Sequence, residues 1–111
     1  MVHAADNDGW TAVMLAAQDG HKDTVHVLVK DCGADVHAAN NDGRTALMHA
    51  AYNGHKDTVE VLVKELNADV NAADNGGDTA VMDARSQGHH DIVKMLKECG
   101  AHDDEEEEEE K

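Results

Sequence analysis

Histidine, cysteine and carboxylate side chains, which most often bind metal ions or take part in catalysis, are abundant in this chain. The sequence of 111 residues contains nine His, two Cys and 24 acidic residues. A zinc site needs Cys or His ligands in two closely spaced pairs, and no such spacing occurs. His89 and His90 are adjacent, but neighbours on a helix do not face each other. We therefore expect no native metal site and no cofactor.

The sequence also shows no motif that is typical of a catalytic site. Cys, His, Asp and Ser are all present, but the sequence shows no strand-to-helix nucleophile turn and no phosphate-binding glycine loop. Most glycines instead follow Asn or Asp, or precede His, which is typical of turns and helix ends. We therefore expect that the protein is not an enzyme.

The elements that must position these residues recur along the chain. Three stretches share one pattern, DGWTAVMLAAQDGHKDTVHVLV, DGRTALMHAAYNGHKDTVEVLV and GGDTAVMDARSQGHHDIVKML. Matching residues lie about 34 positions apart, which indicates one small unit stacked on copies of itself. In each unit a Thr is placed to cap a first helix and a Gly to end it in a left-handed conformation. These residues are Thr11, Thr45 and Thr79, and Gly20, Gly54 and Gly88.

This pattern resembles the ankyrin repeat. The resemblance covers nearly the whole chain and rests on the recurring DG turn, T-x-x-M-x-A segment and GH pair. It implies an all-α ankyrin repeat solenoid of three helix-turn-helix units with β-hairpin-like loops. The expected domain spans residues 1–102, with repeats at about 3–36, 37–70 and 71–102, and the glutamate run at 103–111 is expected to be a disordered tail. Helices of about eight residues are not stable alone, so stacking should stabilise them.

The repeats depart from the usual ankyrin pattern in three places. Ala replaces the proline that usually follows the capping Thr, which leaves the unfolded chain more freedom. Met replaces a His that usually forms hydrogen bonds, so we expect packing there instead. The first two linkers, KDCGADV and KELNADV, are one residue longer than usual. Asn67 stands in place of Gly33, and both residue types tolerate a positive φ. The His of each GH pair is implied to form hydrogen bonds at the helix connection.

The two ends of the array differ. In the third repeat Asp83, Arg85 and Lys97 stand where the other repeats have mostly apolar residues, and we interpret these charges as the polar outer face of a carboxy-terminal cap. The first repeat shows no matching change. Either the chain is a piece of a longer array, or the uncapped first repeat is tolerated or used for self-association.

The charge balance limits the choice of partner. The formal net charge is −15, which disfavours binding to nucleic acid and to anionic membranes and favours a neutral or basic protein surface. No apolar run is long enough for a membrane span. Cys32 and Cys99 lie in different repeats and should be too far apart for a disulfide, which favours a cytoplasmic or nuclear location.

A binding face follows from the resemblance. In ankyrin-like stacks the hairpin tips and the exposed side of the first helices form one concave face that binds a partner protein. Trp10, Arg44 and Tyr52 fall in this set, and these residue types are frequent binding hot spots. The complete predicted set is Asn7, Asp8, Trp10, Leu15, Gln18, Asp19, Asn41, Asp42, Arg44, His49, Tyr52, Asn53, Asn75, Gly76, Asp78, Asp83, Ser86 and Gln87.

Two other interpretations stay open. The first two repeats agree at most positions, which is also what a designed or consensus-like scaffold without a natural partner would show. Asn71 follows an acidic-aliphatic pair, and the resemblance makes it a weak candidate for hydroxylation by cytosolic oxygenases.

Overall fold

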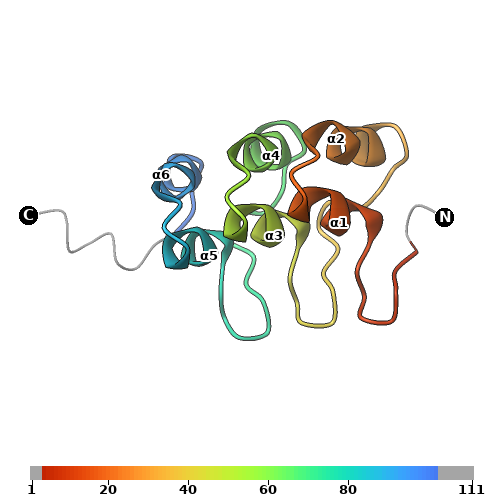
Figure 1. Ribbon diagram of the computed structural model, residues 1–111, viewed down its shortest axis with the longest axis horizontal. Helices are drawn as coiled ribbons and strands as arrows, with labels where there is room; N and C mark the ends of the chain where they lie inside the picture. The colour runs from red at the N-terminus through yellow and green to blue at the C-terminus, as the bar shows by residue number, and fades with distance from the viewer. Residues whose placement is uncertain (1–3, 103–111) are drawn as a thin grey trace, which may run out of the picture.

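The computed structural model describes residues 4–102, and they form an elongated stack of helices in two rows (Figure 1). One row contains α1 (Ala12–Gln18), α3 (Ala46–Tyr52) and α5 (Ala80–Ser86). The other contains α2 (Lys22–Lys30), α4 (Lys56–Glu60) with its continuation η1 (Val61–Glu65), and α6 (His90–Glu98). Hairpin loops extend from the first row. The predicted all-α stack of three two-helix units is confirmed, whereas the predicted tail at 103–111 lies outside the described residues.

The first helix of each repeat begins at a threonine cap. In α1 the Thr11 hydroxyl accepts a hydrogen bond from the Met14 amide at 3.4 Å, and the Thr11 amide donates to the Met14 sulfur at 3.5 Å. The other two first helices begin in the same way. The capping threonines are thus confirmed. Met14 and Met48 are buried, as the expected packing role requires, but Met82 is 43% exposed, so that expectation is wrong in the third repeat. In all three repeats the thioether sulfur also accepts a weak hydrogen bond from the amide of the capping threonine.

Residues with a positive φ end the helices where the sequence predicts them. Gly20, Gly54 and Gly88 have φ values of 77° to 78°, and Asn67 has a φ of 66° in place of a glycine. Left-handed backbone at these positions favours glycine or asparagine. The substitution at position 67 therefore leaves the turn intact.

The extra residue of the first two linkers widens the last turn of the second helix. Four residues separate Leu28 from Gly33, but three separate Leu96 from Gly100. In every repeat the amide after the linker Gly or Asn still donates to the same leucine carbonyl, at 2.9 Å; these pairs are Ala34 with Leu28, Ala68 with Leu62 and Ala101 with Leu96. The additional residue is therefore contained within the turn, and in the second repeat it produces the π-helix η1.

Neighbouring repeats are joined by recurring hydrogen bonds. The Asn41 side chain donates to the Asn7 carbonyl at 3.1 Å, and its amide donates to the Asp8 carbonyl at 2.9 Å. Ring nitrogen Nε2 of His55 lies 2.8 Å from the Gln18 carbonyl at the end of α1. Asn75 and His89 repeat these contacts with the second repeat. The histidines of the GH pairs thus join one repeat to the previous one.

Small residues allow the first helices to pack closely. Ala17, Ala50 and Ala51 are completely buried, between helices of adjacent repeats and beneath the second helices. Val25, Val59 and Leu62 from the second helices complete the core and are equally buried. A larger side chain at the alanine positions would separate the helices.

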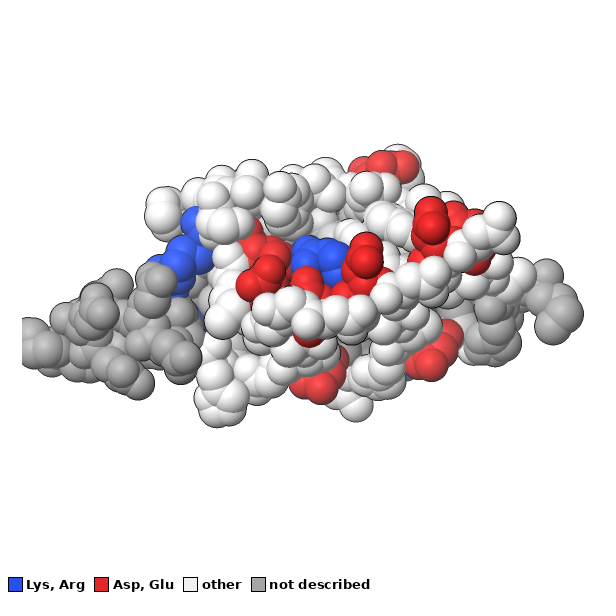
Figure 2. Space-filling view, turned by 90° about the horizontal axis from the view of Figure 1, so that it is seen from below, with Lys and Arg blue, Asp and Glu red and all other residues white. Residues whose placement is uncertain are grey.

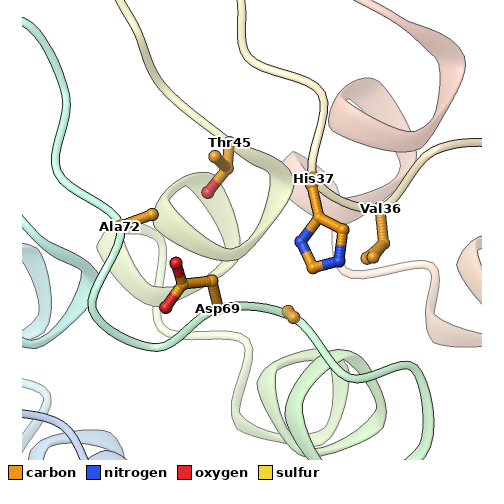
Figure 3. A pocket seen from close by; sticks show the side chains of 6 residues that line it. Val36, His37, Thr45, Asp69 and Ala72 are labelled. Atoms are coloured by element: carbon orange, nitrogen blue, oxygen red, sulfur yellow. The ribbon is translucent and has the colours of Figure 1, made fainter.

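A cavity of about 210 Å³ lies between the loops of the first two repeats (Figure 3). It is lined by Val36, His37, Thr45, Ala68, Asp69 and Ala72. At the equivalent place one repeat later, the Asn71 side chain bridges the loops, because it donates to the Gly100 carbonyl at 3.2 Å and accepts from the His102 amide at 2.8 Å. His37 occupies the position of Asn71 and makes no such bridge.

We predict that His37→Asn stabilises the protein by about 1 kcal/mol, because the amide can bridge to the Asn67 carbonyl and the Asp69 amide. The reverse change, Asn71→His, should destabilise by a similar amount. Urea unfolding followed by circular dichroism measures both changes. Equal effects of the two substitutions, in sign and size, would contradict this account of the bridge.

Candidate functional site

Each hairpin of the predicted binding face has the same internal hydrogen bonds. The Asp6 carboxylate accepts from the Asp8 and Trp10 amides, both at 2.9 Å. Asn40 and Asp74 do the same in the next two hairpins. Such side-chain turns hold the backbone without a regular sheet. As a result Trp10, Arg44 and Asp78 occupy one equivalent position on three equivalent hairpins.

The side chain at this position reaches the first helix of the next repeat. Trp10 stacks on His49 of α3, with ring centroids 4.3 Å apart and an interplanar angle of 28°. His49 is buried, and its Nε2 atom has no hydrogen-bond partner. Stacking of the indole on the imidazole thus buries apolar surface between the first and second repeats.

Arg44 makes the equivalent contact one repeat later, through charge. Its guanidinium donates to Asp74 in the next hairpin and to Asp83 of α5, the latter at 2.6 Å. Both carboxylates are largely buried, with side chains only 8% exposed. Seen from the side of the hairpins, basic atoms near the middle of the face are enclosed by acidic ones (Figure 2). The pairing neutralises Arg44 within the stack.

Burial and pairing shift the pKa values of this cluster. Burial opposes the charge of Arg44, but the hydrogen bonds and charges of Asp83 and Asp74 outweigh it and raise its pKa. Burial also opposes ionisation of Asp74, but hydrogen bonds from the Asp78 amide and from Arg44 lower its pKa. Burial dominates at Asp83 and raises its pKa despite Arg44.

The neutral form of His49 is favoured by the same surroundings. Burial, followed by the nearby positive charge of Arg44, lowers the pKa of His49 to about 4. The ring is therefore uncharged at neutral pH, which suits its stacking against Trp10.

Two residues of the predicted face are buried. His49 and Asp83 are buried beneath the hairpin side chains of the previous repeat, so the expectation that they lie on the open surface is wrong. The interpretation of Asp83 as part of an outer cap is also wrong, because it faces Arg44 of the second repeat. Asp74, which the predicted set omits, belongs to the cluster of Arg44 and Asp83. The sequence signal for Asp74 is its alignment with Asn40, which places it at the start of the next hairpin.

The other predicted residues lie on or near the surface. Trp10, Gln18 and Arg44 are half-buried. The exposed residues are Asn7, Asp8, Leu15, Asp19, Asn41, Asp42, Tyr52, Asn53, Asn75, Gly76, Asp78, Ser86 and Gln87. Leu15 and Tyr52 are large apolar side chains with 50% and 44% exposure. The structure thus brings Trp10 and Arg44 into the stack and leaves Tyr52 accessible.

Comparisons with known proteins agree with this geometry. A family model described as Ankyrin repeats (3 copies) matches residues 32–107, and one described as Ankyrin repeat matches residues 8–41. The chain belongs to the ankyrin repeat family. A search among curated proteins gave no match. Ankyrin repeats are generally protein–protein interaction modules and are typically non-catalytic.

Three further observations concern metal ions, membranes and modification of this ankyrin domain. Within residues 4–102, no group of three or more His, Cys, Asp or Glu side chains is arranged to hold a metal ion. No helix of the described chain has the length and apolar character needed to cross a membrane. Asn71 uses both side-chain amide atoms in the loop bridge, and its hydroxylation stays a prediction.

We predict that the stability of the stack falls as the pH is lowered from about 6.5 to 4, because of His49. Its pKa is about 6.5 in the unfolded chain and about 4 in the folded one, so the unfolded state binds the proton first. The free energy of unfolding should fall by about 2 kcal/mol between about pH 7 and 5, a range above most carboxylate titrations.

Urea unfolding at several pH values measures this effect. The control is His49→Leu, which keeps an apolar contact for Trp10 and should lose that part of the pH dependence. All other histidines are the same in both proteins, so their effects cancel. Parallel stability curves for the two proteins would show that His49 does not cause the pH dependence.

Proposed function

We propose that this domain is a non-catalytic binding module that takes a neutral or basic partner protein on the face formed by its hairpins and first helices. The observation that best supports this proposal is that Arg44 is paired within the stack. Arg44 is the only Lys or Arg in the predicted set, and two carboxylates neutralise its charge. The exposed carboxylates of Asp8, Asp42 and Asp78 therefore dominate the charge of this face, and they favour a partner with basic groups.

Tyr52 supplies the apolar part of the proposed contact. It lies at the end of α3 in the middle repeat, and its side chain is 44% exposed. A rigid aromatic side chain near the centre of a face, surrounded by polar groups, is a frequent hot spot. The same negative charge disfavours nucleic acid and anionic membranes as ligands. Cys32 and Cys99 are free thiols, which suits a reducing location such as the cytoplasm or nucleus.

Trp10 and Arg44 are better regarded as structural residues of the face. Each holds two repeats together, so its substitution by Ala would weaken the stack as well as any partner contact. Loss of binding in those variants would not separate the two causes. Tyr52 and the hairpin carboxylates are therefore the informative positions.

We predict that replacing Asp8, Asp42 and Asp78 together with Asn weakens partner binding about tenfold or more at low salt, because the favourable field of the face is lost. Peptides selected from a random display library on the wild-type domain serve as probes, and calorimetry measures their affinity. They should be rich in Lys and Arg. Tyr52→Ala should cost more than about 1 kcal/mol of binding free energy.

Matched control substitutions on the second helices distinguish an effect of the hairpin face from an effect of the overall charge. Asp23, Asp57 and Asp91 are exposed and occupy equivalent positions in α2, α4 and α6, so their joint replacement with Asn removes the same charge elsewhere. Val27→Ala is the apolar control for Tyr52. The proposal fails if the selected peptides bind the hairpin variant as well as the wild type, or lose equal affinity for the control.

A further inference from the structure

The third hairpin differs from the first two at its tip. The three tips read Asn7-Asp8-Gly9, Asn41-Asp42-Gly43 and Asn75-Gly76-Gly77. Only the third tip has a glycine directly after its asparagine. Unlike the glycine that ends each tip, Gly76 has no positive φ. A Cβ atom on Gly76 would have its nearest contact at 3.6 Å, which is an ordinary distance. Neither the backbone nor the packing therefore requires a glycine at position 76.

A glycine at this position changes the chemistry of the asparagine before it. The amide nitrogen of the following residue attacks the side-chain carbonyl carbon of asparagine, ammonia leaves, and a five-membered succinimide ring closes. The proton of the attacking N–H group ends on the ammonia. Water then opens the ring at one of its two carbonyl groups and gives aspartate or isoaspartate. A side chain on the following residue hinders ring closure, and glycine has none.

The chain contains a second Asn–Gly pair, and there the structure opposes the reaction. Asn53 ends α3, and its side-chain amide donates to the His49 carbonyl at 3.1 Å. The Gly54 amide donates to the Ala51 carbonyl at 3.3 Å, and a Cβ atom on Gly54 would lie 2.6 Å from the His89 ring. Ring closure therefore requires Gly54 to leave a main-chain hydrogen bond and to move against that ring.

The pair at the hairpin tip has fewer constraints. Asn75 and Gly76 are both exposed. The Asn75 side-chain amide is held by one hydrogen bond, to the Asn41 carbonyl at 3.0 Å. The Gly76 amide donates to the Asp74 carboxylate at 2.9 Å, so a proton acceptor already lies on the nitrogen that must lose its proton. The open surface around Gly76 leaves space for the ring to close.

We propose that Asn75 is a site of spontaneous deamidation in the folded protein, and that this reaction weakens the contact between the second and third repeats. The product has a carboxylate in place of the amide, so the donor to the Asn41 carbonyl is lost and two acceptors face each other. Isoaspartate also lengthens the backbone of the turn in which the Gly77 amide donates to the Asp74 carbonyl at 3.0 Å. The reaction consumes only water, so it does not depend on the proposed partner.

Peptide mass spectrometry of the full-length chain, incubated at neutral pH and body temperature, measures the reaction. Trypsin cleaves after Lys and Arg, so Asn41, Asn53 and Asn75 fall in three different peptides. Deamidation adds one mass unit, and fragmentation assigns it to a residue. Asn75 should react at least about tenfold faster than Asn53, because the contacts of Gly54 raise the barrier there. Asn41, which precedes Asp42, should also react more slowly than Asn75.

Two controls separate the effect of the fold from that of the local sequence. In concentrated urea both Asn–Gly pairs should react at similar rates, because the contacts of Gly54 are lost. Gly76→Asp copies the tip of the second hairpin and should suppress the reaction at Asn75 in the folded protein; Gly76→Ala should do the same. The proposed site is overturned if Asn75 reacts no faster than Asn53 in the folded chain, if their difference persists in urea, or if both substitutions leave the Asn75 rate unchanged.

Asn75→Asp tests the consequence for the stack, because it places one product of the reaction in every molecule. Its midpoint of urea unfolding, followed by circular dichroism, should be lower than that of the wild type. The matched control is Asn7→Asp, which adds the same charge to the first hairpin. The Asn7 side chain makes no hydrogen bond within residues 4–102, so this control should keep the wild-type midpoint. Equal midpoints of the two variants would show that deamidation does not weaken the contact between repeats.

Discussion

No repeat of this chain can bury its own apolar surface, and this constraint governs the rest of the structure. Helices of five to nine residues are too short to be stable alone, so each depends on the surface that a neighbour covers. Thr58 in the second repeat is buried, whereas the equivalent Thr24 in the first is exposed. Stability therefore resides mainly in the contacts between repeats, as in a one-dimensional array. The hairpins keep their places along the stack because those contacts hold them there.

Features that depend on nearby residues could be predicted from the sequence. Thr11 caps a helix through a residue three positions away, and Gly20 ends that helix through its own backbone freedom. Such interactions are the same wherever the segment occurs. For this reason the first helices begin directly after the predicted capping residues Thr11, Thr45 and Thr79. The widened turn that produces η1 is only partly predictable. The sequence shows that the linker is one residue longer than usual, but it does not show how the hydrogen bonds accommodate that residue.

Features that depend on the next repeat were harder to predict. The family resemblance predicts His49 and Asp83 at the surface because of their places on a first helix. Their burial is caused by residues 39 positions earlier, Trp10 and Arg44. The aligned repeats contain the signal for this burial. The hairpin residue Trp10 precedes His49 at one interface, and the hairpin residue Arg44 precedes Asp83 at the next. Recognising it requires comparing one repeat's hairpin with the following repeat's helix.

The contacts between repeats are of two kinds, with different consequences. Those made by Asn41 and His55 recur in the next repeat and allow any unit to stack on any other. Those made by Trp10 and Arg44 differ and restrict which unit can follow which. Exchange of the two hairpin residues would place a guanidinium beside buried His49 and leave Asp83 without its cation, so the order of the repeats is specified. This order keeps Arg44 neutralised inside the stack and the remaining hairpin carboxylates at its surface. The acidic character of the face is therefore a consequence of how the repeats recognise one another, as well as of the overall charge of −15.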